Sequence, residues 1–157
     1  MSYMKLIKML YLADRQSLIE TGYPITGDRP VSMDRGPVLS RVLDLINWGG
    51  SSVWQRFISP SHDYDIDLLE PAGTDELSPY EVEVLHSINE RFGGLDRWAL
   101  VRYTHTLPEW VDPAGAAVEI DPRVILREAG KSDEEIQEIA SQVDAIWTFE
   151  NLYAAAR

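Results

Sequence analysis

The sequence has no cysteine among its 157 residues. Disulfides, a thiolate nucleophile and cysteine-ligated zinc are therefore excluded, and the composition suits a reducing compartment, so we expect a cytoplasmic protein. Long hydrophobic runs are missing too, since none approaches the ~20 residues of a membrane-spanning helix. The first hydrophobic stretch, 1–12, contains Lys5 and Lys8 and is not followed by a small-residue cleavage site, which argues against a signal peptide.

Basic residues are scarce, with 14 Lys and Arg against 26 Asp and Glu and a formal net charge of -12. Such a surface repels phosphate backbones, which argues against direct nucleic-acid binding and favours a basic protein partner. The asymmetry is strongest over 57–90, which contains nine acidic residues and no Lys or Arg. Two interpretations of this stretch remain open: a solvated acidic face, or a docking surface for a basic protein.

Motifs that carry catalysis are also lacking. The three histidines, His62, His86 and His105, show no metal-ligand spacing, and there is no phosphate-binding glycine loop or Gly-x-Ser-x-Gly nucleophile turn. We therefore expect no metal, no cofactor and no enzyme activity. A small hydrolase that uses Asp14 and His105, with Ser40 completing a triad on paper, is the least favoured alternative.

The length fits a single domain, 1–157, because no internal repeat, low-complexity tract or polar linker interrupts the chain. Residues 3–21 predict a helix that is hydrophobic on most of its circumference, which is typical of a central helix. Its remaining face carries Lys5, Lys8, Arg15 and Gln16. Hydrophobic periodicity and capping residues predict further helices at 38–48, 79–92, 96–106, 122–130 and from 132 onward.

Extended segments are few and predict a small antiparallel sheet. A short strand is expected near 30–33, at a sheet edge because of Pro30. Residues 53–69 alternate as in a hairpin, with Asp65 and Asp67 on its acidic face. The predicted fold class is α+β and mainly α-helical, with about six helices around a central N-terminal helix.

Two polar side chains are expected to serve the fold. Asp14 lies on the hydrophobic stripe of the first helix, where a carboxylate needs a partner. Arg29, Arg35 or backbone N–H groups of the following loop could supply it, and the favoured role of Asp14 is to pin that loop to the helix. His105 ends a helix, where an imidazole can bond a carbonyl or a carboxylate and pack beside Trp110.

Three segments taken together resemble a known family. They are 4–14 (Met-Lys-Leu-Ile-Lys-Met-Leu-Tyr-Leu-Ala-Asp), 24–38 with its Thr-Gly-Asp and Gly-Pro-Val motifs, and 104–110, which begins Thr-His and ends Pro-Glu-Trp. In order and spacing they are similar to the Panacea domain family, also described as Soc-type antitoxins or phage-associated GepA-like proteins. The resemblance runs from Met4 to Trp110, and the helix from Ser132 resembles the family's C-terminal helix.

This resemblance implies an antitoxin that neutralises a cognate toxin protein by direct binding. It also implies an alternative, a proteolytic adaptor that delivers the toxin to an AAA+ protease. The family fold that it implies is mainly helical with a small sheet. Relatives often carry a helix before the first one, which leaves open a natural start upstream of Met1.

The chain departs from the family pattern in the loop before Gly36. Pro30 stands where an aromatic residue is usual, and Asp34-Arg35 replaces a proline or an aromatic residue, in a loop that can serve as a recognition surface. Affinity is expected from an aromatic or arginine cluster. The candidate anchors are Trp48, Trp54 and Trp110, and the expected partner-binding residues are Asp28, Arg29, Asp34, Arg35, Asp65, Asp67 and Trp110.

Overall fold

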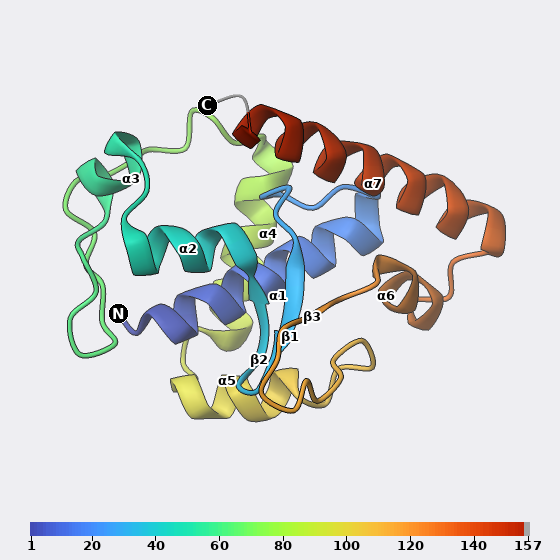
Figure 1. Ribbon diagram of the computed structural model, residues 1–157, viewed down its shortest axis with the longest axis horizontal. Coiled ribbons are helices and arrows are strands. Elements are labelled where there is room, and N and C mark those ends of the chain that lie inside the picture. Colours follow the sequence, from blue (N-terminus) through green and yellow to red (C-terminus); the bar gives the residue numbers. More distant parts are fainter. Residues whose placement is uncertain (156–157) are drawn as a thin grey trace.

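The computed structural model describes residues 1–155, which form a mainly helical α+β fold with a small antiparallel sheet (Figure 1). The predicted fold class is confirmed. The helices are α1 (Tyr3–Thr21), α2 (Ser40–Trp48), α3 (Ser52–Phe57), α4 (Pro79–Phe92), α5 (Arg97–Thr104), α6 (Pro122–Glu128) and α7 (Asp133–Ala155), and the strands are β1 (Pro30–Met33), β2 (Gly36–Leu39) and β3 (Val118–Glu119). Over residues 1–155, no helix has both the length and the hydrophobicity that crossing a membrane requires.

The central element is α1, as the sequence predicts. It is buried on most of its circumference, with Ile7, Tyr11, Leu12 and Leu18 all in the core, and it contacts α2, α4, α5, α6 and β2. Figure 1 shows α1 running through the middle of the molecule. The helix ends at Gly22, which adopts the left-handed conformation with a φ of 82°.

The sheet places a tight turn against α5. Strand β1 lies between β2 and β3 and pairs antiparallel with both. Met33 pairs with Gly36, so Asp34 and Arg35 alone form the turn between β1 and β2. Gly36 has a φ of 92°, and a Cβ atom there would lie 2.6 Å from Thr104 Oγ1. Glycine therefore permits both the backbone conformation and the close packing of this turn.

Residues 36–39 form a strand, whereas the sequence predicts a helix that begins at Val38. The left-handed backbone of Gly36 cannot begin a helix, and Val38 instead pairs with Val31 across the sheet. Helix α2 begins only at Ser40, after four buried strand residues. The hydrophobic run continues from the strand into the helix, so periodicity alone does not show where one ends and the other begins.

The hairpin predicted at 53–69 is found only in part: its first residues form a helix, and 58–69 folds back on itself through antiparallel bridges. The Ser51 side chain instead begins the short helix α3 by accepting a hydrogen bond from the Trp54 backbone N–H (3.1 Å). After α3, residues 58–69 contribute isolated antiparallel bridges and no strand. The leucines at the end of this segment are exposed. Backbone hydrogen bonds join the two arms, from the Ser59 N–H to the Asp67 carbonyl (3.0 Å) and from the Leu69 N–H to the Phe57 carbonyl (2.8 Å). Within 58–69 only Ile66 is buried, so little hydrophobic surface is available to extend this pairing into regular strands.

Side-chain caps begin the later helices where the sequence predicts them. Ser78 and Glu81 form a reciprocal capping box at the start of α4. Ser132 and Glu135 make the same two hydrogen bonds at the start of α7, and Asp96 caps α5. These bonds join residues two or three positions apart, so the sequence alone is enough to predict them.

Candidate partner-binding site

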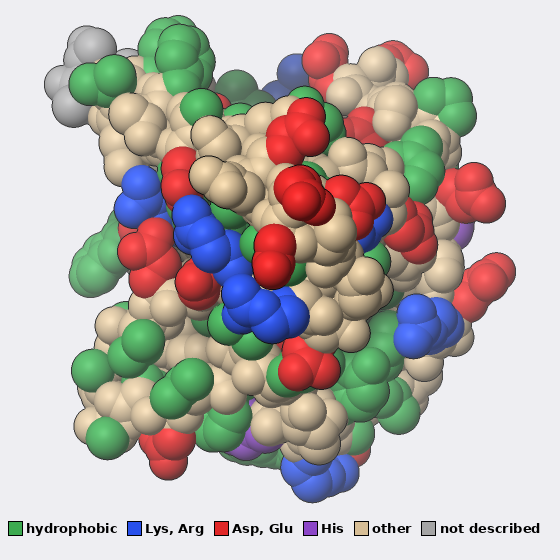
Figure 2. Space-filling view, turned by 90° about the vertical axis from the view of Figure 1, so that its right-hand side faces the viewer, with side chains coloured by type: hydrophobic (Ala, Val, Ile, Leu, Met, Phe, Trp, Pro, Cys, Tyr) green, Lys and Arg blue, Asp and Glu red, His purple; other side chains and the backbone are tan. Residues whose placement is uncertain are grey.

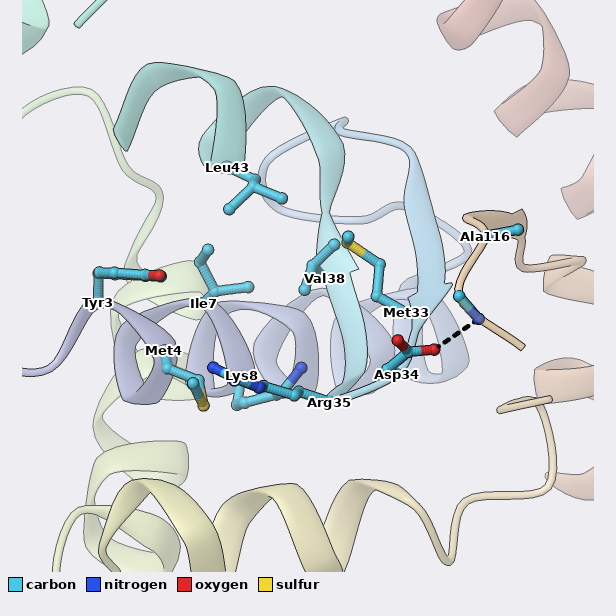
Figure 3. Close-up of a pocket in the computed structure, with 11 residues that line it drawn as sticks. Tyr3, Met4, Ile7, Lys8, Met33, Asp34, Arg35, Val38, Leu43 and Ala116 are labelled. Atoms are coloured by element: carbon cyan, nitrogen blue, oxygen red, sulfur yellow. Dashed lines mark hydrogen bonds between the residues drawn. The ribbon is translucent and has the colours of Figure 1, made fainter. Parts of the chain in front are cut away.

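A cavity of about 240 Å³ lies between the N-terminal half of α1 and the β1–β2 turn (Figure 3). Hydrophobic side chains form most of its wall, and a lysine and the two turn residues supply its charges. The lining residues are Tyr3, Met4, Ile7 and Lys8 of α1, Met33, Asp34, Arg35 and Val38 of the hairpin, Leu43 of α2, and Gly115 and Ala116 of the loop before β3. The cavity therefore combines a hydrophobic interior with charged groups, as ligand and partner sites commonly do.

Lys8 is buried in this wall, although the sequence places it on the polar face of the helix. Its side chain is 1% exposed, and Nζ donates a hydrogen bond to the Pro37 carbonyl (2.5 Å). Within residues 1–155 it forms no ion pair. Burial lowers the pKa of its ammonium group to about 7. The hydrophobic stem of a lysine packs well in such a wall, whereas its amine loses hydration there.

Exposed aromatic rings lie next to the cavity, in contact with Arg35 and Tyr3 of its lining. The Arg35 guanidinium lies over the Trp98 ring at 5.6 Å, and the Arg97 guanidinium lies 5.5 Å from both the Trp98 and Tyr64 rings. Tyr64 in turn contacts Tyr3, with ring centroids 6.0 Å apart. Trp98 is 45% exposed and Tyr64 is 50% exposed. We call Arg35, Tyr64, Arg97 and Trp98 the aromatic rim.

Three of the predicted partner-binding residues meet at this site. Asp34 and Arg35 are exposed in the β1–β2 turn, and Asp34 Oδ1 accepts a hydrogen bond from the Gly115 backbone N–H (2.9 Å). Trp110 lies half-buried behind the turn and donates from Nε1 to the Met33 carbonyl (3.1 Å). Trp110 therefore supports the turn with its polar atom rather than presenting that atom to a partner.

The acidic loop at 58–69 borders the same site. Asp65 and Asp67 are both exposed on it. The loop is held to the start of α1 because Tyr3 donates its backbone N–H to the Tyr64 carbonyl (2.9 Å). Two acidic side chains predicted to bind a partner thus belong to the loop that carries one ring of the aromatic rim.

Arg29 lies away from this cavity. Its guanidinium forms an ion pair with Glu119 (3.4 Å) and lies over the Trp147 ring at 5.4 Å. Nearby on α6, Arg123 pairs with both Asp121 and Asp144. Figure 2, which views the molecule from the side of α6, shows acidic and basic side chains interspersed across this face. The two arginines on this side are therefore already engaged with carboxylates of the same chain.

Asp28 is buried, at 3% exposed, and serves the fold. Its Oδ1 accepts hydrogen bonds from the backbone N–H groups of Arg29 (2.6 Å) and Arg41 (3.1 Å), and its Oδ2 accepts one from Val42 N–H (3.0 Å). Helix α2 has no side-chain cap of its own, so Asp28 supplies one from the preceding loop. The prediction that Asp28 contacts a partner conflicts with this burial.

Replacing Asp28 with alanine is expected to lower the free energy of unfolding by about 2 kcal/mol, because the first turn of α2 loses its acceptors. Urea unfolding measures the loss. Asp34→Ala is the matched control, since that exposed carboxylate accepts a single backbone hydrogen bond, and it should change stability by no more than about 0.5 kcal/mol. Equal losses in the two variants would contradict the capping role.

Asp14 pins the loop after α1, as predicted. It accepts hydrogen bonds from the Thr26 backbone N–H (2.9 Å) and from the Thr26 hydroxyl. The partner is thus the loop itself, and neither Arg29 nor Arg35 pairs with this carboxylate. Burial raises the pKa of Asp14 to about 6 even though the Thr26 hydrogen bonds act in the opposite direction.

His105 ends α5 and stacks on Trp110, with ring centroids 4.0 Å apart, which confirms its predicted place. Burial lowers its pKa, and the nearby Lys8 charge lowers it further, against a hydrogen bond with the Asp34 backbone.

The alternative catalytic triad of Asp14, His105 and Ser40 is not present. Ser40 donates a hydrogen bond to Asp28, and Asp14 accepts one from Thr26. Over residues 1–155, no three His, Asp or Glu side chains are placed to hold a metal ion.

A buried network that the sequence analysis missed joins α1 to the segment after α5. Glu109 Oε1 accepts hydrogen bonds from the Tyr11 hydroxyl (2.6 Å) and from Arg15 Nε (2.7 Å). Glu109 is 4% exposed. Burial, followed by the charge of Glu109, raises the pKa of Tyr11 well above its usual range. The one hint of this network in the sequence is Glu109 itself, a carboxylate directly before Trp110 in the segment 104–110 that resembles the family.

Comparison with protein families identifies one match. The family model described as "Antitoxin SocA-like, Panacea domain" matches residues 6–111, which is more than half of the chain. The matched range includes most of α1, the β1–β2 turn and α5, and therefore most of the cavity wall and the whole aromatic rim. A comparison with curated proteins and one with solved structures each found no match.

Proposed function

We propose that this chain, which belongs to the SocA-like antitoxin family with a Panacea domain, neutralises a cognate toxin protein by direct binding. The family match over residues 6–111 is the observation that carries the proposal. A net charge of -12 supports a basic partner, because opposite charges raise the rate of encounter and penalise unsuited partners. In this proposal the chain acts in the cytoplasm as a binding protein and transforms no substrate.

The cavity and its aromatic rim are the proposed binding surface. Trp, Tyr and Arg dominate the binding energy of protein interfaces, and the rim presents all three next to a hydrophobic cavity. Cation–π stacking holds these side chains in place before binding, which reduces the entropy that they lose on association. The nearby carboxylates Asp34, Asp65 and Asp67 add the negative charge that a basic toxin would meet at the edge of the interface.

Trp98→Ala is expected to weaken toxin binding by about 2 kcal/mol, or roughly thirtyfold, because it removes the ring on which both rim arginines lie. The toxin candidate is the protein encoded by the adjacent gene, and co-purification followed by titration calorimetry measures its binding. Trp48→Ala is the matched control, since Trp48 is 80% exposed on α2 and lies outside the rim. Equal weakening by both variants would contradict the assignment of this surface.

Co-expression tests the function itself. The chain should form a complex with the toxin and restore growth of cells that express it, and failure of both would overturn the antitoxin proposal.

A chase experiment that follows the half-life of the toxin distinguishes sequestration from delivery to a protease. A toxin that stays intact in the complex supports sequestration, whereas a toxin whose half-life shortens when this chain is present supports delivery to an AAA+ protease instead.

A further inference from the structure

We propose that the cavity beside Lys8 binds the C-terminal residue of the partner polypeptide, with the terminal carboxylate at Lys8 and Arg35 and the last side chain in the hydrophobic interior. This inference rests on the proposed function in taking that partner to be the toxin. It adds what the family match does not supply, namely which chemical group enters the cavity.

The interior of the cavity suits one hydrophobic side chain. Ile7 and Val38 line it from α1 and β2, and Leu43 covers it from α2. Figure 3 shows these three side chains directed toward the same space. Its volume of about 240 Å³ leaves room for a single large residue and not for a folded element. Burial of a leucine-sized side chain would supply the hydrophobic part of the binding energy.

The charges at the cavity select an anion. Lys8 Nζ has three N–H donors and uses one of them on the Pro37 carbonyl, so two remain for a ligand. Arg35 stacks on Trp98 and forms no ion pair within residues 1–155, so its planar donors are open to a carboxylate. Asp34 is the one acidic side chain in the lining, and Gly115 N–H already occupies one of its oxygens.

The position of the two cations favours a carboxylate on a hydrophobic body over a bare inorganic anion. Lys8 from α1 and Arg35 from the β1–β2 turn both line the cavity, and Figure 3 draws them below the hydrophobic side chains of Ile7, Val38 and Leu43. A phosphate or sulfate ion could bind the two cations but would leave that hydrophobic wall without a contact. A bound carboxylate would also compensate Lys8 for the hydration that its amine has lost.

Continuity with the aromatic rim favours the end of a polypeptide over a free small acid. Arg35 belongs to both the cavity lining and the rim, so a chain whose last residue enters the cavity can lay its preceding residues over Trp98. Trp98 and Tyr64 are both about half exposed and could cover such a chain. Recognition of a terminal carboxylate together with neighbouring residues is an established way of reading chain ends.

The test is an NMR titration of the whole chain with N-acetylated Gly-Gly-Leu, comparing the free carboxylate with the C-terminal amide. The free acid should bind at least about tenfold more tightly than the amide, because charge-assisted hydrogen bonds are lost with the charge. Lys8→Met should reduce that difference, and Lys8→Met combined with Arg35→Met should remove it, because both cations are proposed to hold the carboxylate. Lys5→Met is the matched control, since Lys5 is on the same helix, bonds the Gly93 carbonyl and lies outside the cavity, and it should leave the difference intact.

Three results would overturn the inference: equal binding of acid and amide, a preference for the acid that Lys8→Met leaves undiminished, or N-acetyl-leucine binding as tightly as the tripeptide. The toxin-binding assay and the peptide titration test separate claims, so either can fail without the other. If the intact toxin binds while no free-acid peptide does, the inference is wrong and the proposed function stands. If the peptides bind while the toxin does not, the cavity is assigned correctly and the proposed function is wrong.

Discussion

Glu109→Ala is expected to lower the free energy of unfolding by about 3–5 kcal/mol, as measured by urea denaturation. Glu109 is buried, and its carboxylate accepts hydrogen bonds from the Tyr11 hydroxyl and from Nε and Nη2 of Arg15 (2.6, 2.7 and 3.3 Å). Alanine would leave a guanidinium without its counter-charge and a buried hydroxyl without its acceptor. Both partners lie on the central helix α1, so the loss falls on the core of the fold.

Two further variants show whether the network itself is responsible. Tyr11→Phe removes one donor and leaves the ion pair, so it should cost only about 1 kcal/mol. Glu119→Ala removes the exposed partner of Arg29, and an exposed pair of this kind contributes at most about 1 kcal/mol. A loss for Glu109→Ala no larger than that for Glu119→Ala would contradict a stabilising role for the buried network.

Local signals in the sequence were enough to predict most of the helices. The capping residues of α4, α5 and α7 bond backbone groups two or three positions away, so their effect is fully contained in a short window. The breaks at Gly22 and Gly93 are of the same kind. The central place of α1 also followed from the sequence, because a helix that is hydrophobic nearly all round has to be enclosed.

Contacts between distant segments account for the errors. The cap of α2 comes from Asp28, twelve or more positions before the groups that it bonds, and no short pattern reveals such a partner. Strand β2 exists because Val38 meets Val31 across a turn, although its residues also continue the helical periodicity of α2. The helical pattern places Lys8 on the polar face of α1, because such a pattern distinguishes charged from hydrophobic residues and cannot show that a lysine is covered by β2.

Only some residues of the candidate site could be predicted from the sequence. Asp34 and Arg35 stood out because they depart from a family pattern, and they do lie at the cavity mouth. Tyr64 and Trp98 belong to separate segments that meet through the two rim arginines, so only the folded chain shows that they form one surface. Trp110, the tryptophan predicted from the sequence to bind a partner, instead stacks on His105 behind the β1–β2 turn.

Lys8→Met is expected to raise the free energy of unfolding by about 2–3 kcal/mol at pH 7. Lowering the pKa of a buried ammonium group from 10.5 to about 7 corresponds to a cost of at most about 5 kcal/mol in the folded state. Methionine removes that cost and has a side chain of similar volume. It also leaves the Pro37 carbonyl without its hydrogen-bond donor, which destabilises the folded state by about 2 kcal/mol and offsets part of the gain. A residue retained at such a cost is typical of a functional site.

The gain should also depend on pH in a defined direction. Between pH 7 and 10.5 the unfolded chain binds one proton more at Lys8 than the folded chain, so wild-type stability rises with pH by up to ~1.4 kcal/mol per pH unit relative to the variant. The advantage of Lys8→Met should therefore be constant below pH 7, shrink above it and vanish before pH 10.5. Paired urea titrations measure it, with Lys5→Met as the control. An advantage that does not change across this range would show that the folded chain keeps Lys8 charged, and it would remove the energetic argument for a ligand-binding role.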